Sequence, residues 1–399
     1  MMDPSYWVRS PPFPGARVTI DFDSFTPDAL RRHPTEKWCE PDVIGAGVAE
    51  MDFGVAPEVA AAVRTAVDAG ALAYPTPRQE EAARAACAGW FGRTTGWEIG
   101  PGRVHLTADV LTALTLVLDH LVPAGAPVVL PVPNYMPFLS LPELFGHPVL
   151  RVPGITDAAG RYTMDLDGID AAFRAGGRLL ILCNPHNPVG RVYDRAELLA
   201  LAAVVDANGG RVFSDEIHAP LVLDPTRRHV PYAAVDDVTA GHAITAAAIS
   251  KGWNVPGLKC AQLIISNDAD AARFAPVARF AAHQASTPGI IATAAAYDDG
   301  GPWLAEVVEY LRGNAAHLGD LVRRQLPGVG YWQPEGTYLA WLDTRGLAPE
   351  DPSRFFADHA RVLTTNGAAC GAPRFTRFNF AMARPTLDQA LARMGEVLR

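Results

Sequence analysis

Short, continuously apolar runs alternate with longer segments of helical spacing from residue 104 to about residue 266. Runs such as R-L-L-I-L-C and A-I-T-A-A-A-I are too short for buried helices and too apolar for half-exposed strands. Such runs are typical of strands whose two faces are both covered, as in a mostly parallel sheet. The strands predicted on this basis span 104–106, 127–131, 178–183, 211–217, 243–249 and 262–266, with helices at 110–121 and 196–208. The pattern therefore predicts an α/β fold with a doubly wound sheet.

The flanking regions follow different patterns. Residues 1–48 show no convincing periodicity, whereas 56–69 and 80–91 have helical spacing on either side of a proline-containing loop at 71–77. Beyond residue 295 we predict a long amphipathic helix, two antiparallel strands and a closing helix, at 303–326, 338–342, 374–381 and 387–398. We therefore expect three parts: residues 1–49 as an N-terminal segment joining the small domain, 50–295 as the large domain, and 296–399 as a small α+β domain.

Composition narrows the class of protein. The chain has 399 residues, 49% of them hydrophobic, and a net charge of −9, which argues against nucleic-acid or anionic-membrane partners. No run approaches the roughly 18 apolar residues that a membrane span needs, and the N-terminus lacks the layout of a signal peptide. The five cysteines are scattered and form no C-x-x-C pair. We therefore expect a cytoplasmic protein with neither disulfides nor a metal site.

Lysine usage adds a chemical signal. Only Lys37, Lys251 and Lys259 are lysines among 34 basic residues, and two of them lie within nine residues of each other. Unlike arginine, lysine can lose its proton and attack a carbonyl to form a Schiff base. Lys251 follows a predicted buried strand ending at Ser250, and the glycines and proline of G-W-N-V-P-G forbid a regular element after it. The alternative is a solvated loop lysine in a genome that favours arginine.

Polar residues at the ends of two further strands strengthen this interpretation. Asn187 follows the strand 178–183, and Asp215 lies near the end of R-V-F-S-D-E-I. In an open α/β sheet, ligands bind beyond the carboxyl ends of the strands. An amide, a carboxylate and an amine there match the needs of a pyridine aldehyde, whose ring nitrogen is kept protonated by the carboxylate. Taken singly, Asn187 suits a turn, Asp215 a helix cap and Lys251 a surface charge.

Six motifs carry a family resemblance that covers residues 22 to 398. They read V-A-E-M-D-F, N-P-H-N-P-V-G-R-V, S-D-E-I-H-A, S-K-x-x-N-x-x-G-L-K, E-G-T-Y-L-A-W-L-D and R-F-N-F-A. The chain resembles fold-type I pyridoxal-phosphate enzymes of the class I/II aminotransferase superfamily. Within that superfamily it is similar to the MalY/PatB branch, the cystathionine β-lyases and cysteine-S-conjugate β-lyases. The resemblance implies pyridoxal 5′-phosphate as cofactor and a homodimer.

The resemblance also assigns roles residue by residue. Lys251 corresponds to the Schiff-base lysine, Asp215 to the partner of the ring nitrogen, and Asn187 to the contact of the phenolic oxygen. Tyr135 corresponds to the tyrosine stacked on the ring and Arg377 to the clamp of the substrate α-carboxylate. The other implied contacts are His218 near the cofactor, Lys259, Val110, Leu111 and Ser250 around the phosphate, Tyr74 donated by the neighbouring subunit to the phosphate and the substrate, and Ala49 and Asn187 at the substrate.

Three residues depart from the branch pattern. Gly47 and Glu50 replace the tryptophan and first aspartate of W-V-A-D-M-D-F, a segment expected to line the substrate entrance. Asp109 stands where the branch commonly has glycine in the phosphate turn, and we expect it to cap the following helix while pointing away. We interpret His186 as structural, and Met51, Trp253 and Trp341 as packing residues.

The resemblance favours one reaction and leaves others open. The first hypothesis is α,β-elimination from a cysteine S-conjugate, giving a thiol, pyruvate and ammonia, with Tyr135 or Lys251 protonating poorer leaving groups. Amino-group transfer is an alternative on the same scaffold. A decarboxylating or oxidative deamination of an S-substituted cysteine is another, as in natural-product biosynthesis. A catalytically silent cofactor-binding regulator is the alternative outside enzymes.

Overall fold

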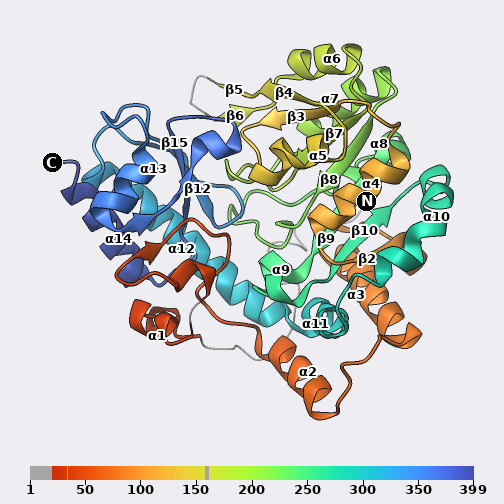
Figure 1. Cartoon of the computed structure of the whole chain (residues 1–399), viewed down its shortest axis with the longest axis horizontal. Helices are drawn as coiled ribbons and strands as arrows, with labels where there is room; N and C mark the ends of the chain where they lie inside the picture. Colours follow the sequence, from red (N-terminus) through yellow and green to blue (C-terminus); the bar gives the residue numbers. More distant parts are fainter. Residues whose placement is uncertain (1–19, 34, 158–160) are drawn as a thin grey trace.

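The computed structural model describes residues 20–33, 35–157 and 161–399. The expectations for residues 1–19, including the layout of the N-terminus, lie outside this part of the chain. A large sheet and a smaller one form the centres of the two halves of the molecule (Figure 1). Among the described residues, no helix combines the length and apolar character that crossing a membrane would require.

The large sheet has seven strands in the order β2-β10-β9-β8-β7-β3-β4. They are β2 (Val104–Thr107), β10 (Ala261–Ile265), β9 (Ala243–Ala248), β8 (Arg211–Asp215), β7 (Leu179–Cys183), β3 (Val128–Val132) and β4 (Val149–Pro153). Only β10 runs antiparallel to its neighbours. The predicted mostly parallel sheet is thus confirmed.

Alternating residues of the buried strands pack against helices on opposite faces. In β7, Leu179 and Ile181 join the apolar core beneath α4 (Val110–Leu121) and α10 (Asp268–Ala282). Leu180 and Leu182 face the other way, into the core beneath α6 (Leu166–Arg174) and α7 (Arg195–Ala207). The remaining helices of this half are α2 (Pro57–Asp68), α3 (Pro77–Thr95), α5 (Leu141–Leu144), α8 (Asp237–His242), α9 (Ile249–Gly252) and α11 (Thr287–Asp299), and a short hairpin joins β5 (Ile155–Thr156) to β6 (Tyr162–Thr163). Coverage of both faces explains why the strand sequences are continuously apolar.

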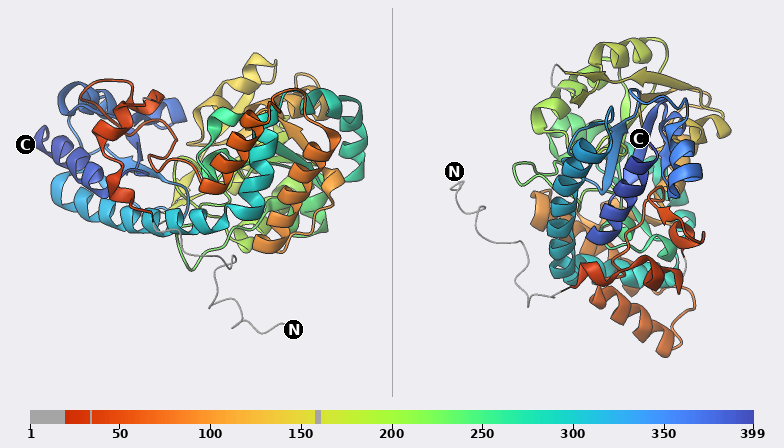
Figure 2. Two further views of the ribbon diagram at one scale, coloured as in Figure 1. Left: turned by 90° about the horizontal axis from the view of Figure 1, so that it is seen from below. Right: turned by 90° about the vertical axis from the view of Figure 1, so that its left-hand side faces the viewer.

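The second sheet is antiparallel, in the order β11-β12-β15-β14. Its strands are β11 (Gly330–Tyr331), β12 (Leu339–Asp343), β15 (Phe375–Asn379) and β14 (Thr365–Asn366). Two helices pack beside it, α12 (Gly301–Gln325) and α14 (Arg384–Glu396), and a short helix α13 (Pro352–Phe355) precedes β13 (Val362–Leu363). The long α12 runs from the half that holds the seven-stranded sheet to the half that holds the smaller one (Figure 2). The two antiparallel strands expected in this region are confirmed as β12 and β15.

The described N-terminal segment packs against the C-terminal part of the chain. It contains α1 (Pro27–Arg31) and β1 (Ile44–Gly45), which pairs in parallel with β13. These elements are too short to give a periodic sequence signal, so the expectation of an irregular segment was wrong only for these few residues. A buried ion pair, Lys37 Nζ to Asp52 Oδ1 at 2.8 Å, connects the segment to the stretch after β1. Boundaries near residues 49 and 295 stay predictions.

Candidate active site

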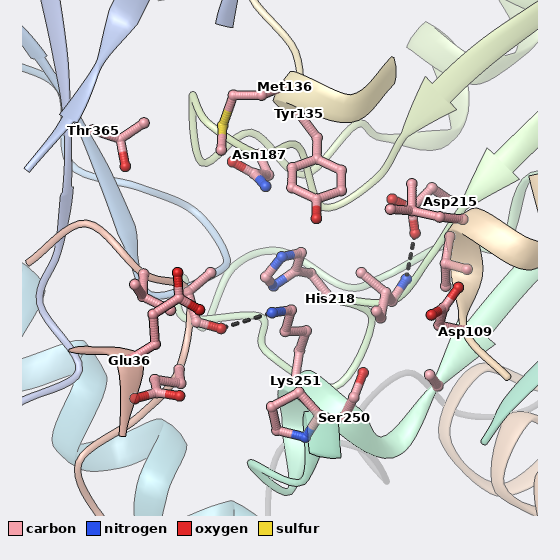
Figure 3. A pocket seen from close by; sticks show the side chains of 18 of the residues that line it. Glu36, Asp109, Tyr135, Met136, Asn187, Asp215, His218, Ser250, Lys251 and Thr365 are labelled. Carbon is pink, nitrogen blue, oxygen red and sulfur yellow. Dashed lines mark hydrogen bonds between the residues drawn. The ribbon is translucent and has the colours of Figure 1, made fainter. Parts of the chain in front are cut away.

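A cavity of about 690 Å³ opens at the carboxyl ends of β7, β8 and β9, beside the N-terminus of α4. Residues of β13, β14 and β15 close its other side. The predicted site residues that line it are Ala49, Val110, Leu111, Tyr135, Asn187, Asp215, His218, Ser250, Lys251, Lys259 and Arg377. Figure 3 shows Lys251 and His218 near the centre, with Tyr135 above them and Asp215 to one side. The strand-end rule thus correctly placed Asn187, Asp215 and Lys251 at one cavity.

Lys251 lies in α9, a single helical turn that follows β9 directly. The expected strand to Ser250 and irregular turn were wrong here, because the strand ends at Ala248 and the next four residues close one α-helical turn. Its Nζ atom donates a hydrogen bond of 2.7 Å to the carbonyl oxygen of Ala49. Desolvation, together with the nearby positive charge of Arg377, lowers the pKa of Lys251 to about 8. About a tenth of this amine is therefore neutral and nucleophilic at pH 7, far more than of an ordinary lysine.

Asp215 is the last residue of β8 and is buried. Its Oδ1 accepts a hydrogen bond of 3.1 Å from the backbone N–H of Ile217, and the Cys183 thiol lies 3.9 Å from Oδ2. Burial raises the pKa of Asp215 to about 7. Because no cationic side chain of the described residues forms an ion pair with it, this carboxyl group suits a ligand that brings its own positive charge.

Arg377 joins the two halves of the cavity from β15. Its Nη1 donates to Asn187 Oδ1 at 3.0 Å, and its Nη2 donates to the carbonyl of Gly47 at 2.9 Å and to Thr365 Oγ1 at 3.2 Å. Its Nε is buried without a partner among the described residues. A planar guanidinium held in this way is oriented to receive a carboxylate.

Tyr135 and His218 face each other across the cavity (Figure 3). Burial, with Asp215 nearby, raises the pKa of Tyr135, so its phenol remains protonated. His218 is 1% exposed, and burial together with Lys251 and Arg377 moves its pKa well below the ordinary value. Its ring is therefore neutral, and its Nδ1 has no hydrogen-bond partner among the described residues.

The N-terminus of α4 forms the end of the cavity where a phosphate is expected. Asp109 caps this helix by accepting a hydrogen bond of 2.8 Å from the backbone N–H of Thr112. The expectation that it points away was wrong, because Asp109 lines the cavity and its Oδ2 lies 2.9 Å from Lys259 Nζ. Although burial acts in the opposite sense, the bonds from Thr112 and Lys259 lower the pKa of Asp109. The backbone N–H groups of Val110 and Leu111 remain at the helix N-terminus, where an anion is favoured.

The segment from Gly47 to Glu50 forms the wall beside Lys251. Asn379 Nδ2 fixes it by donating to the carbonyls of Val48 and Glu50, at 2.6 and 2.7 Å. Tyr338 also donates its hydroxyl to the Ala49 carbonyl, at 2.9 Å. A Cβ atom at Gly47 would lie 3.3 Å from the backbone of Thr364, so glycine permits the close packing of this segment on the neighbouring strand.

Sequence reasoning missed several residues of this wall. Tyr338 and Asn379 lie within the E-G-T-Y and R-F-N-F motifs, which were recognised without a role for these two positions. Glu36 and Thr365 also line the cavity but belong to no motif, and only the tertiary structure places them there.

Tyr74 is the one predicted site residue outside this cavity. Its side chain is 86% exposed, and its ring makes an edge contact with His283 at a centroid distance of 6.0 Å. It lines a separate hollow that also contains Glu80 and Arg84. The role in a neighbouring subunit's site stays a prediction.

The structure agrees with the interpretation of His186 as structural and of Met51, Trp253 and Trp341 as packing residues. His186 Nδ1 lies 2.8 Å from the Tyr193 hydroxyl and its Nε2 lies 3.0 Å from the Pro133 carbonyl, while burial lowers its pKa to about 3. Met51 and Trp253 are buried in the core, and Trp341 stacks on Phe375.

Known proteins match the chain over almost its whole length. The sequence model of the aminotransferase class I and II family matches residues 41–394. The chain belongs to this family.

Three relatives illustrate the branch of the family. Cystathionine β-lyase of Corynebacterium glutamicum is 35% identical over 93% of this chain and 98% of its own length. Cystathionine β-lyase PatB of Bacillus subtilis is 31% identical over 90% of this chain and 93% of its own. The crystal structure of a putative pyridoxal-phosphate-dependent β-cystathionase from Corynebacterium diphtheriae superposes with a TM-score of 0.88 at 34% identity, covering 94% and 98% of the two chains. The resemblance inferred from the motifs, and the fold-type I α/β class, are confirmed.

The cavity of this family member fits pyridoxal phosphate. It offers an amine of lowered pKa for the aldehyde, at Lys251, and a buried carboxyl group without a cationic partner for the ring nitrogen, at Asp215. The N-terminus of α4 offers backbone N–H groups for the phosphate. Among the described residues at the phosphate end of the cavity, Asp109 carries the one charge that disagrees with this ligand, and Lys259 already pairs with it.

Proposed function

We propose that the protein is a pyridoxal-phosphate-dependent carbon–sulfur β-lyase. It acts on cysteine S-conjugates, of which cystathionine is one, and releases a thiol, pyruvate and ammonia. The observation that carries the proposal is the meeting of Lys251, Asp215 and Arg377 in one cavity. Relatives named cystathionine β-lyase, aligned over more than nine-tenths of the chain, support it.

Each residue has a task in the elimination. The bound cofactor supplies an electron sink for the pair left behind when the substrate Cα loses its proton. Arg377 binds the α-carboxylate, and Asn187, already bonded to Arg377 Nη1, holds the guanidinium in place. Lys251 accepts the Cα proton, because an amine of pKa about 8 is a competent base near neutral pH.

The leaving group needs a second proton transfer. When the bond between Cβ and sulfur breaks, the electron pair departs on sulfur. A thiolate leaves readily because the pKa of its thiol is near about 8.5. Tyr135, whose pKa is raised, or protonated Lys251 supplies a proton to poorer leaving thiolates. Water then hydrolyses the released aminoacrylate to pyruvate and ammonia.

An S-alkyl cysteine incubated with the enzyme and no keto acid tests the reaction. Continuous formation of equal amounts of pyruvate and thiol over many turnovers is expected. Reduction of the resting enzyme with borohydride should attach the cofactor to Lys251, and a label on Lys37 or Lys259 would contradict the assignment.

Amino-group transfer is the second candidate, because it gives the matched family its name. It would stop after one turnover unless a keto acid is added, with the amino group retained on the cofactor. An S-substituted aldehyde with carbon dioxide would instead indicate the decarboxylating reaction.

The proposal includes a homodimer and a cytoplasmic location. The exposed Tyr74 supports a subunit interface at α3 and its preceding loop. The five free cysteines support a reducing compartment.

A further inference from the structure

The charged side chains around the active-site cavity are not balanced. The described residues that line it include three cationic side chains, Lys251, Lys259 and Arg377. Lys259 is paired with Asp109 at 2.9 Å. On the proposed function, Lys251 is taken by the cofactor and Arg377 by the substrate α-carboxylate. None of the three is left for the substituent that the substrate carries on sulfur.

Two carboxylates of the same lining have no cation within ion-pair distance among the described residues, Glu36 and Glu50. Glu50 is half-buried and accepts a hydrogen bond from the Thr35 hydroxyl, a neutral donor. Lys37, the cation nearest to both residues in the sequence, forms an ion pair with Asp52 at 2.8 Å. It contacts the backbone carbonyl of Glu50 but not the Glu50 carboxylate. The negative charges of Glu36 and Glu50 therefore remain available to a ligand.

Glu50 lies close to the position of the reacting group. It follows Ala49, whose carbonyl accepts the hydrogen bond from Lys251 Nζ, and its own backbone is fixed by Asn379 at 2.7 Å. Glu36 and Thr365 lie on the opposite side of Lys251 from Asp109 and Asp215 (Figure 3). The cofactor is expected on the side of Asp215. The side with Glu36 therefore remains for the rest of the substrate.

The lining of the cavity also contains buried polar atoms that have no hydrogen-bond partner among the described residues. His218 Nδ1 and Thr364 Oγ1 are buried without a hydrogen bond to any described residue, and their residues are 1% and 9% exposed. Met136, Leu363 and Asn366, which also line the cavity, carry no charge. A polar ligand satisfies such atoms, and two unneutralised carboxylates determine the sign of its charge.

We infer that the cavity selects cysteine S-conjugates whose sulfur substituent carries a positive charge, with Glu50 as the principal specificity-determining residue and Glu36 as its outer support. This inference rests on the proposed lyase function. An ammonium or imidazolium on the substituent forms a charge-assisted hydrogen bond with Glu50 in a partly desolvated site. A substituent that carries a carboxylate but no ammonium group meets two like charges without a compensating cation, so it is rejected, whereas the ammonium group of cystathionine can pair with Glu50.

Three cysteine derivatives of similar length test the inference on the holoenzyme. S-(3-aminopropyl)-L-cysteine is cationic at its end, S-butyl-L-cysteine is its neutral isostere, and S-(2-carboxyethyl)-L-cysteine is anionic. Dissociation constants come from the change in cofactor absorbance on mixing, and elimination is followed separately as pyruvate release. We expect the cationic compound to bind roughly tenfold more tightly than the neutral one, the size of a hydrogen bond to a charged group, and the anionic compound to bind most weakly.

Glu50→Gln should reduce the advantage of the cationic over the neutral compound to within about threefold. Glu36→Gln should reduce it less, because this carboxylate is exposed to solvent. The matched control is Glu143→Gln, an exposed glutamate on α5 away from the cavity, which should keep the wild-type ratio. A further measurement uses the wild-type enzyme and so does not depend on the folding of a variant. The tighter binding of the cationic over the neutral compound should diminish as the salt concentration rises from about 0.02 to 0.5 M.

Different results would contradict the charge selection and the lyase function. Equal dissociation constants for all three compounds, or a ratio unchanged in Glu50→Gln, would overturn the charge selection even if pyruvate is released from each. Charge-ordered binding without any pyruvate would uphold the selection and overturn the lyase.

Discussion

Asp109 shows how a single residue serves two neighbouring groups. One carboxylate oxygen caps α4 through Thr112, and the other neutralises Lys259. A phosphate at the same helix end competes for both the helix N-terminus and the lysine. We therefore expect the carboxylate to favour the apoenzyme at the expense of cofactor affinity.

Replacing Asp109 by Asn should therefore tighten cofactor binding. Asparagine keeps the capping oxygen but removes the negative charge and frees Lys259, so we expect an affinity gain of roughly five- to tenfold, as for the loss of one partly exposed like charge. Titration of apoenzyme with the cofactor, followed by absorbance, measures the change.

Asp165→Asn is the matched control, since Asp165 caps α6 in the same way outside the cavity. Unchanged or weaker binding in Asp109→Asn would show that the ion pair with Lys259 organises the phosphate site instead of competing for it.

The pKa values of Asp215 and Lys251 make a stability prediction for the apoenzyme. A carboxyl group whose pKa is raised by folding stabilises the protein below its unfolded value, and this stabilisation is lost as pH rises through about 7. The effect on Asp215 is on the order of 4 kcal/mol. Lys251, whose pKa is lowered to about 8, acts in the opposite direction above that pH, where stability returns. Apoenzyme should thus be least stable near pH 7 to 8.

Thermal unfolding of apoenzyme and holoenzyme between pH 4 and 10 measures this effect. The minimum should be absent from the holoenzyme, in which both groups are engaged by the cofactor. In Asp215→Asn apoenzyme the fall between pH 4 and 7 should flatten. An apoenzyme whose stability rises steadily across that range would be inconsistent with a buried, unpaired Asp215.

Residue types and strand ends were sufficient to predict most of the catalytic groups. Lys251 and Asn187 each follow a buried strand and Asp215 ends one, and the topology of an α/β sheet brings such positions together. Glu36 and Thr365 were not predictable in this way, because they reach the cavity through pairing of β1 with β13 and of β14 with β15. No local pattern encodes contacts between segments so distant in the chain.

At the scale of elements, the segment 46–54 depends on side chains supplied by other elements. Asn379 of β15 binds the carbonyls of Val48 and Glu50, and Asn254 binds both backbone groups of Met51 and the carbonyl of Gly54. A segment that belongs to no helix or strand needs such side chains to satisfy its backbone. The asparagines of S-K-x-x-N and R-F-N-F thus support the substrate wall.

Asn379→Ala should leave the carbonyls of Val48 and Glu50 without these donors. We expect about 2 kcal/mol lower stability and a raised KM for the S-conjugate, since the wall beside Lys251 loosens. Urea unfolding and steady-state kinetics measure the two effects. Asn208→Ala, which removes bonds to Asp170 and Val204 far from the cavity, should lower stability without changing KM. A KM that stays at the wild-type value in Asn379→Ala would contradict a role of Asn379 in positioning the wall beside Lys251.

Two of the helices that sequence reasoning did not predict, α10 and α11, have a common cause. α10 and α11 are rich in alanine and other small residues, so their apolar residues do not form one distinct face. In α11, Ile290, Ala292, Thr293 and Ala296 are all buried where the helix packs against α3 and α2. Their start signals were nevertheless in the sequence, as the capping residues Asn267 and Ser286.

At the scale of the whole molecule, variants of Tyr74 test whether the two subunits of a dimer share an active site. Tyr74→Phe and Lys251→Ala proteins should each be impaired when pure. If Tyr74 acts in the partner's site, mixed dimers contain one site with both residues intact, and random exchange should restore about a quarter of wild-type activity. Pyruvate release after mixing measures the recovery. Lack of recovery, with subunit exchange verified by mass spectrometry, would exclude a shared site.

The contact between Arg377 and Gly47 spans 330 positions of the chain, and that separation has a consequence for biosynthesis. The segments that carry Asn187, Asp215 and Lys251 leave the ribosome before β15 does. A nascent chain can thus assemble the groups expected to hold the cofactor while the wall at residues 47–50 still lacks Arg377 and Asn379. The wall that selects the substrate is therefore completed later than the groups expected to hold the cofactor, because it requires β15.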